Sequence, residues 1–172
     1  MHYQYINLNN QQDLIEGVVL RKLIIHRDES GSLVETLRID WQDVYGSNLP
    51  FTMQYMSITP AGSIRDEDQW HFHKNQEDRF ICAKGRIVTA VFDSRRESKT
   101  FGRLSLFLMG PEKEEEVYML VIPKNTYHGF AVISKDEGYL LNFPTQLYNK
   151  EDEGRVANKE LDWQKALQDF QN

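Results

Sequence analysis

Residues 78–93, DRFICAKGRIVTAVFD, hold two short apolar runs on either side of a Lys-Gly pair. Both runs are rich in β-branched and aromatic residues, and each has the length of a strand rather than that of a typical helix. Glycine and charged residues between such runs favour a turn. This stretch therefore predicts two consecutive β-strands.

The same pattern extends outward from this stretch in both directions. Gly, Pro, Asp and charged residues separate further apolar runs, which are GVVLRKLIIHRD, SLVETLRID, FTMQYMSIT, WHFHK, LSLFLMG, EVYMLVIP, HGFAVIS and GYLLNFP. Many short strands without intervening helices are typical of a β-sandwich or β-barrel. We therefore expect an all-β fold, with its barrel over about residues 18–148.

The C-terminal segment differs from the rest of the chain. In KEDEGRVANKELDWQKALQDF, apolar residues that include Leu161, Leu167 and Phe170 recur at helical spacing among polar residues. We expect one short helix against the outside of the barrel, within a helical segment over about residues 150–171. The chain has 172 residues, which fits a single domain over residues 1–172 that buries most of its apolar surface.

Charge and cysteine content argue against several classes of protein. The net charge of −6, without a long basic run, disfavours a nucleic-acid or anionic-membrane partner. Cys82 is the single cysteine, so no internal disulfide can form, and its apolar neighbours indicate a buried thiol. The first residues lack the layout of a secretion signal, and no apolar run has the length needed to cross a bilayer. We expect a cytoplasmic protein.

Two histidines lie one residue apart in WHFHKNQED, residues 70–78. Strand alternation sends His71 and His73 to one face, and His128 lies at the start of another predicted strand. Three imidazoles and the Glu77 carboxylate can meet inside a small barrel, and this set suits a divalent transition metal. The alternatives are proton transfer on a bound substrate and a hydrogen-bonded core group without chemistry.

The spacing H-x-H-x-x-x-E, followed much later by PKNTYH, resembles the two metal motifs of the cupin family. The glycines of those motifs are displaced, with Gly62 too early and Asn125 in the place of the second glycine. Asparagine tolerates positive φ angles better than most residues, so we expect the turn to survive. The resemblance implies a jelly-roll barrel.

A second resemblance covers roughly residues 18–155. The segments KGRIVTAVFDSRRESKTFGR, VIPKNTYHGFAV and LNFPTQLYNKEDE resemble the dTDP-4-dehydrorhamnose 3,5-epimerase family, a branch of the cupin superfamily. WHFHKNQED and NFPTQLYN are similar to a subgroup found with sugar-nucleotide and surface-polysaccharide genes. The resemblance implies a homodimeric cupin jelly roll that acts on a nucleotide-linked 4-keto-6-deoxyhexose, with no obligatory metal.

The reaction implied by this resemblance needs a base and an acid. The ketone acidifies the neighbouring carbons, so a base removes a proton, an enolate forms, and an acid returns a proton from the other face. By the family's motif the base falls on His71, and histidine suits this role because its pKa lies near working pH. The expected substrate contacts are Glu35, Gln54, Arg65, His73, Lys74, His128 and Asn142.

The chain departs from the family at two positions. Asn142 matches the family's acid, a tyrosine, and Asp78 matches its enolate-stabilising lysine. An amide has no proton to give at neutral pH, and a carboxylate repels an enolate. We expect Tyr139 or Tyr148 to donate the proton instead.

Other polar or charged residues near these motifs have expected roles. Lys74 or Arg79 is the expected source of positive charge, and Asn158 or Asp162 lies near the place of the family's aspartate that orients the histidine. Glu77 alternates with its neighbour at position 78, so only one of the two carboxylates can point into the barrel.

The sequence leaves three functions open. The first is epimerisation or keto-enol isomerisation beside a ketone, with His71 as base and no cofactor. The second is a metal-dependent cupin that holds one divalent transition metal through His71, His73, Glu77 and His128. The third is a non-catalytic cupin that binds a sugar nucleotide and has lost the acid.

Overall fold

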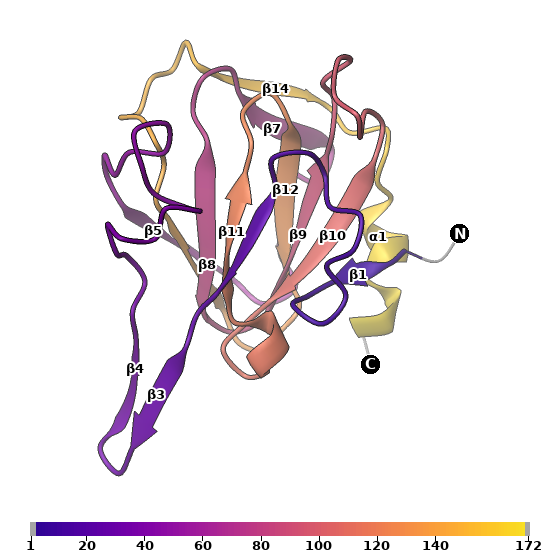
Figure 1. The fold of residues 1–172 in the computed structure, drawn as a ribbon. Helices are drawn as coiled ribbons and strands as arrows, with labels where there is room; N and C mark the ends of the chain where they lie inside the picture. The colour runs from indigo at the N-terminus through magenta and orange to yellow at the C-terminus, as the bar shows by residue number, and fades with distance from the viewer. Residues whose placement is uncertain (1–2, 171–172) are drawn as a thin grey trace.

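The computed structural model describes residues 3–170, which form two β-sheets that face each other (Figure 1). The larger sheet has the order β1-β10-β9-β12-β7-β14, and β6 also pairs with β12. Its strands are β1 (Tyr5–Ile6), β6 (Ile64–Arg65), β7 (Gln69–His73), β9 (Ile87–Phe92), β10 (Leu104–Met109), β12 (Tyr127–Val132) and β14 (Glu153–Ala157). The smaller sheet has the order β2-β11-β8-β13-β5, with strands β2 (Val19–Lys22), β5 (Tyr55–Thr59), β8 (Asp78–Lys84), β11 (Tyr118–Ile122) and β13 (Gly138–Asn142). The predicted all-β jelly roll is confirmed.

Residues 78–93 link the two sheets. They form β8 and β9 as expected, but β8 pairs with β11 and β13, whereas β9 pairs with β10 and β12. The chain crosses between the sheets at Gly85, whose φ is 74°. A Cβ atom there would lie 2.6 Å from Ser134 Oγ and 2.8 Å from the Glu137 carbonyl oxygen. Glycine is therefore required at this crossing.

Strand alternation divides the apolar residues between an interior core and two outer clusters. The interior core lies between the sheets and includes Phe80, Ile87, Val91, Phe107, Leu120, Ile122 and Phe130. The outer cluster on the larger sheet includes Trp70, Val88, Leu106, Leu161, Trp163 and Leu167. The outer cluster on the smaller sheet includes Val44, Tyr45, Ile81, Met119, Val121 and Phe143. Each large buried side chain contributes about 1.5–3 kcal/mol, so these clusters supply the main stabilisation of the barrel.

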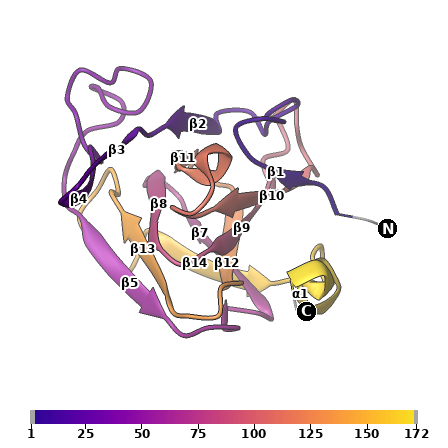
Figure 2. The ribbon, with the colours of Figure 1, turned by 90° about the horizontal axis from the view of Figure 1, so that it is seen from below.

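The C-terminal segment is only partly the helix that the sequence predicted. Residues Trp163–Ala166 form the short helix α1, and Gln168–Phe170 add a 3-10 turn, η2, which confirms a short helix packed on the outside (Figure 2). The start of the predicted helical segment, about 150–171, is wrong, because Glu153–Ala157 form β14 and pair with β7. Residue 171, like residues 1, 2 and 172 of the predicted domain, lies outside the described residues.

A two-stranded arm projects from the barrel (Figures 1 and 2). Its strands are β3 (Ile25–Asp28) and β4 (Gly31–Val34), and they form a separate sheet with a turn inside the predicted ESGS break. The 3-10 helix η1 (Glu114–Glu116) precedes β11. Across residues 3–170, we find no helix with the length and apolar character needed to cross a membrane.

A buried arginine fixes the segment that leads into β5. Arg79 points to the outer face of β8 and is completely buried. Its guanidinium donates to the carbonyl oxygens of Phe143 (2.7 Å), Val44 (2.9 Å), Leu49 (2.9 Å) and Pro50 (2.7 Å). The predicted role of this arginine as a charge for the substrate is therefore wrong, since its donors are engaged by the protein on the outside of the sheet.

Candidate active site

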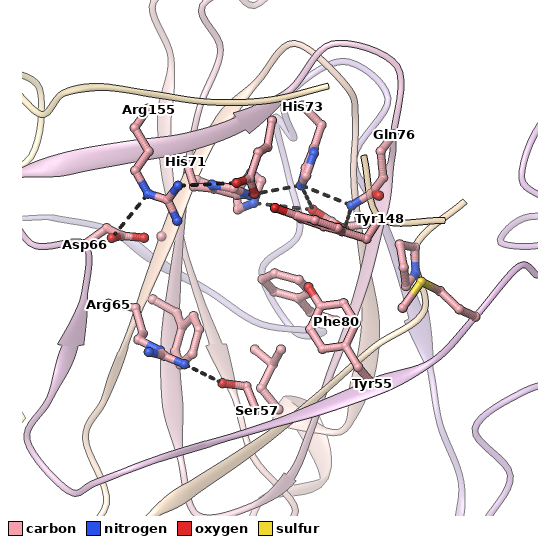
Figure 3. A pocket seen from close by; sticks show the side chains of 18 residues that line it. Tyr55, Ser57, Arg65, Asp66, His71, His73, Gln76, Phe80, Tyr148 and Arg155 are labelled. Atoms are coloured by element: carbon pink, nitrogen blue, oxygen red, sulfur yellow. Dashed lines mark hydrogen bonds and ion pairs between the residues drawn. The ribbon is translucent and has the colours of Figure 1, made fainter. Parts of the chain in front are cut away.

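The two sheets enclose a cavity of about 480 Å³ (Figure 3). Its apolar lining includes Phe80, Phe130 and Leu140. Its polar lining comprises Tyr55, Ser57, Arg65, Asp66, His71, His73, Gln76, Asp78, His128, Tyr148, Glu153 and Arg155. The structure therefore confirms that His71, His73 and His128 face one cavity, as strand parity predicts.

The three histidines form a close cluster because of strand register. β7 and β12 pair with His71 opposite His128, and His73 lies two residues further along the same face. The Nε2 atoms of His71 and His73 are 3.0 Å apart, and one ring nitrogen from each of the three lies within 4.8 Å of the others. His71 is the most accessible, with 19% of its side chain exposed against 10% and 6% for His73 and His128.

Burial keeps two of these imidazoles neutral at neutral pH. Burial lowers the pKa of His128 to about 3, because a charged ring would lose its hydration. Burial, and then the charge of His73, lowers the pKa of His71. At a separation of 3.0 Å, one ring donates its hydrogen to the other, so His71 and His73 form a hydrogen-bonded pair.

A buried carboxylate lies beside the histidines. Asp78 Oδ2 is 3.4 Å from His128 Nε2 and 3.6 Å from His73 Nε2. Its Oδ1 accepts hydrogen bonds from Gln76 Nε2 (2.9 Å) and Asn142 Nδ2 (2.7 Å). Asp78 is 2% exposed, so these contacts replace the water that it loses.

The other acidic candidate points elsewhere. Glu77 is absent from the cavity lining, and its backbone N–H donates to Thr145 Oγ1 at 2.9 Å. Strand alternation brings Asp78 inward in its place. The prediction that one of the two carboxylates faces inward is confirmed, but Glu77 as a member of the histidine cluster is wrong.

The residue before β14 supplies a second carboxylate. Asp152, directly before β14, lies with Oδ2 3.4 Å from His73 Nδ1. It also accepts hydrogen bonds from the backbone N–H groups of Asn75 (2.9 Å) and Gln76 (3.2 Å). Hydrogen bonds from Asn75 and Gln76 keep the pKa of Asp152 below its usual value even though burial opposes this. Asp152 thus fixes the turn between β7 and β8 and places a carboxylate beside the His73 ring.

The two residues predicted to orient the histidine serve the C-terminal segment instead. The Asn158 side chain donates to the Leu161 carbonyl oxygen (2.8 Å), and the Asp162 side chain accepts from the Lys165 backbone N–H (3.0 Å) as the cap of α1. The sequence prediction failed here because it treated residues 150–157 as helical.

Two arginines line the cavity. The Arg65 guanidinium donates to Ser57 Oγ at 3.0 Å. Arg155, on β14 opposite His71, lies 3.6 Å from Asp66 and 3.7 Å from Glu153. These weak pairs leave both guanidinium groups available to an anion. Arg155 was not predicted as a site residue, because the segment that forms its strand was expected to be helical.

Four predicted site residues lie away from the cavity. The Tyr139 hydroxyl donates to Glu137 Oε1 at 2.8 Å on the outside of the barrel, which contradicts its predicted catalytic role. Lys74 is exposed and donates to the Glu151 carbonyl oxygen at 2.9 Å. Gln54, directly before β5, and Glu35, beyond the arm, are also exposed. The Glu35 carboxylate pairs with Arg38 at 2.9 Å.

Tyr148 and Asn142 lie at the edge of the cavity, and Asn125 lies in the turn before β12. Tyr148 lines the cavity and is 69% exposed, whereas Asn142 is completely buried beside it. Asn125 has a φ of 59°, so the expected turn without glycine is confirmed. Its backbone N–H donates to the His73 carbonyl oxygen at 2.7 Å, which ties this turn to β7.

A cavity with neutral histidines and buried carboxylates inside a jelly roll defines a cupin equipped for acid–base or metal chemistry. A family model described as dTDP-4-dehydrorhamnose 3,5-epimerase matches residues 12–169. The chain therefore belongs to this family, as the sequence resemblance indicates, and is an enzyme of the carbohydrate epimerase type.

Individual relatives agree with this assignment. A probable low-salt glycan biosynthesis epimerase of Haloferax volcanii is 37% identical over 139 residues, which are 80% of this chain and 83% of that protein. The spore coat polysaccharide biosynthesis protein SpsL of Bacillus subtilis is 31% identical over 147 residues, or 83% of this chain and 89% of that protein. A dTDP-sugar isomerase from Desulfovibrio desulfuricans has the same fold, with a TM-score of 0.74, 23% identity and coverage of 84% of this chain and 87% of that chain.

Proposed function

We propose that this nucleotide-sugar epimerase acts on a 4-keto-6-deoxyhexose linked to a nucleoside diphosphate, with His71 as the base. The observation that carries the proposal is the neutral, partly accessible imidazole of His71 in the cavity, hydrogen-bonded to His73. Its relatives act in glycan and spore coat polysaccharide biosynthesis by their names, which supports a role in surface polysaccharide or deoxysugar biosynthesis.

The surrounding groups fit proton abstraction beside a ketone. His71 takes the proton from carbon, and the electron pair of the broken C–H bond becomes the enolate. The Glu153 carboxylate, 4.0 Å from His71 Nε2, favours the imidazolium that forms. Arg65 and Arg155 supply positive charge for the diphosphate.

The direct test is exchange of solvent deuterium into a nucleotide-linked 4-keto-6-deoxyhexose. We expect His71→Ala to lower the exchange rate by at least about a hundredfold, the usual loss for an acid–base group. His73→Ala should lower it less, and His26→Ala, on the exposed arm, is the matched control. Wild-type protein that exchanges no proton of any such sugar contradicts the proposal.

The nucleotide part of the substrate is tested by binding. A structural neighbour from Legionella pneumophila, 24% identical with a TM-score of 0.72 over 92% of this chain and 80% of that chain, was solved in complex with dTDP-4-keto-L-rhamnose. We expect a nucleoside diphosphate to raise the melting temperature of this protein by mass action, and a free hexose to do much less. Negligible shifts with thymidine, uridine, cytidine and guanosine diphosphates contradict the sugar-nucleotide part of the proposal.

Metal binding is a second proposal. The three histidine nitrogens within 4.8 Å of one another support it, since imidazoles suit a divalent transition metal, and the carboxylate beside them is Asp78 rather than Glu77. Such an ion would supply Lewis-acid stabilisation of an enolate oxygen. Metal analysis of protein purified without chelator or a metal column separates the two proposals. A stoichiometric ion that His128→Ala removes supports a metal, and an ion-free active protein contradicts it.

A homodimer and a cytoplasmic location are also part of the proposal. Exposed apolar side chains support the dimer, with Ile24 (62%) and Leu33 (61%) at the arm and Met56 (50%) and Ile58 (49%) on the outward face of the edge strand β5. The single, buried cysteine Cys82 fits a reducing compartment. Analytical ultracentrifugation of Leu33→Asp is the test, since a dimer that persists unchanged contradicts an interface through the arm.

A further inference from the structure

Inversion at a carbon needs a proton donor on the face opposite the base. His71 reaches the cavity from β7 in the larger sheet, so a donor for inversion must come from the other side. In the second half of the reaction the enolate electron pair forms a new C–H bond with the donor's proton, and the ketone is restored. The donor keeps the electron pair of its O–H bond and later regains a proton from solvent, while the imidazolium loses one.

The tyrosines narrow the choice of donor. All eight lie within residues 3–170, and two of them, Tyr55 and Tyr148, line the cavity. The others are engaged elsewhere. Tyr118, for example, donates to the Leu108 carbonyl oxygen at 2.7 Å, and Tyr127 packs against Phe72 on the outside of the larger sheet.

Tyr55 comes from the sheet opposite the histidines. It begins β5, the edge strand of the smaller sheet, and its Cα is paired in register with that of Asn142 on β13. Figure 3 shows its ring projecting into the cavity beside Phe80, across from His71. The base and the phenol therefore approach a bound sugar from opposite walls.

The hydrogen bonds of Asn142 determine what the phenol can donate. Asn142 Oδ1 accepts from the backbone N–H of Arg79 at 3.0 Å, which fixes the orientation of the amide. Asn142 Nδ2 then gives one hydrogen to Asp78 Oδ1 (2.7 Å) and the other to the Tyr55 hydroxyl oxygen (2.8 Å). Because the phenol oxygen accepts this bond, its own hydrogen is free to point at a ligand.

We propose that Tyr55 is the proton donor for inversion and that Asn142 is the residue that positions it. This inference rests on the proposed function, since it assigns the second proton transfer of the same reaction. Burial and the nearby Asp78 carboxylate raise the pKa of Tyr55, although the Asn142 hydrogen bond and Arg65 oppose them, so the phenol is protonated at neutral pH. A protonated group can deliver a proton to the enolate.

Comparison of exchange with inversion tests the assignment. Tyr55→Phe removes one hydroxyl from a half-exposed side chain, so we expect the variant to fold, as checked by its melting temperature. It should exchange solvent deuterium into the substrate within a fewfold of wild type but invert the carbon at least about a hundredfold more slowly. Tyr148→Phe, which removes the other cavity phenol, is the matched variant and should invert faster than Tyr55→Phe by a similar factor.

The outcomes separate this assignment from the proposed function. Inversion by Tyr55→Phe within a fewfold of wild type overturns the assignment alone, and inversion lost in Tyr148→Phe instead gives the role to Tyr148. Absence of exchange in wild-type protein overturns the proposed function and the assignment together. Exchange that disappears in His71→Ala and persists in Tyr55→Phe supports both.

A second measurement does not depend on loss of activity. Difluorotyrosine at position 55 has a more acidic phenol than tyrosine. Since the donor must be protonated, the fall in inversion rate at high pH should move to lower pH with this residue, whereas the exchange rate should keep its profile. An unchanged inversion profile overturns the assignment. Asn142→Leu should slow inversion more than exchange, because it releases the phenol without removing it.

Discussion

Replacement of Arg79 by methionine should destabilise the protein by about 4 kcal/mol. Four carbonyl oxygens lose their donor, and two of them, those of Val44 and Phe143, accept bonds that are fully buried. The bonds to Leu49 and Pro50 are partly buried, so water can replace the guanidinium there. Two unsatisfied buried carbonyls at about 1–3 kcal/mol each give about 2–6 kcal/mol in total.

Arg21→Met is the matched control for this prediction. Both guanidinium groups lie over an aromatic ring, Arg21 4.3 Å from the centre of Trp41 and Arg79 4.4 Å from that of Tyr45. Arg21, however, pairs with Asp43 in a partly exposed salt bridge, which is worth about 1 kcal/mol or less. The two variants therefore share a lost cation–π contact and differ in the lost buried hydrogen bonds.

Urea unfolding of the two variants measures the difference. A loss of 4 kcal/mol corresponds to a fall in Tm of about 10 °C for a domain of this size. Equal destabilisation by Arg79→Met and Arg21→Met, or a cost below about 1 kcal/mol at position 79, refutes the reasoning. Arg79→Met should also slow inversion, because the hydrogen bond from Arg79 to the Pro50 carbonyl oxygen holds the chain just before β5 and Tyr55.

Three further predictions concern charge. Because burial and the charge of His73 lower the pKa of His71 below its ordinary 6.5, kcat/KM should rise with pH and reach half its maximum below pH 6.5. A midpoint above pH 7 contradicts this. Arg155→Ala should weaken dTDP binding in calorimetry about tenfold or more, the loss of one charged hydrogen bond, whereas Lys22→Ala, remote from the cavity, should bind normally. Hydrogen bonds depress the pKa of the buried Asp93 carboxyl, so its contribution to the stability of the folded protein is present above about pH 4 and is lost as pH falls. Asp93→Asn should therefore flatten the fall of the urea midpoint between about pH 4 and pH 2, and an equally steep fall in the variant refutes this.

Alternation along strands accounts for the features that could be predicted from the sequence. His71 and His73 share parity, and apolar residues on the other face pack outward, so a single histidine cavity follows from the pattern. Alternation also shows that Glu77 and Asp78 cannot both face inward. It cannot choose between them, because the turn between β7 and β8 sets the parity of β8, and Asp152 fixes that turn from a distant part of the chain.

The strand β14 could not be predicted because its inner face lines a polar cavity. In EGRVA the charged Glu153 and Arg155 line the cavity and Val156 packs outward, and this mixture resembles an exposed helix in composition. The strand passes Phe72 at Gly154, where a Cβ would lie 2.3 Å from the ring, so any larger residue requires that ring to move. Asp152 and Arg155 were missed for the same reason. Tyr55 had a weak signal, as it shares inward parity with Ser57 on β5.

The pairing of β7 with β14 makes the candidate site depend on a segment that is translated long after the histidines. A ribosome produces His71 and His73 long before it produces Asp152 and β14. Until then β7 has one unpaired edge, which can pair with another nascent chain. A chain that is released early therefore lacks Asp152, which fixes the turn after β7, and Arg155, which lines the cavity. We expect translation that stops before β14 to yield an inactive, aggregation-prone product rather than an enzyme of altered specificity.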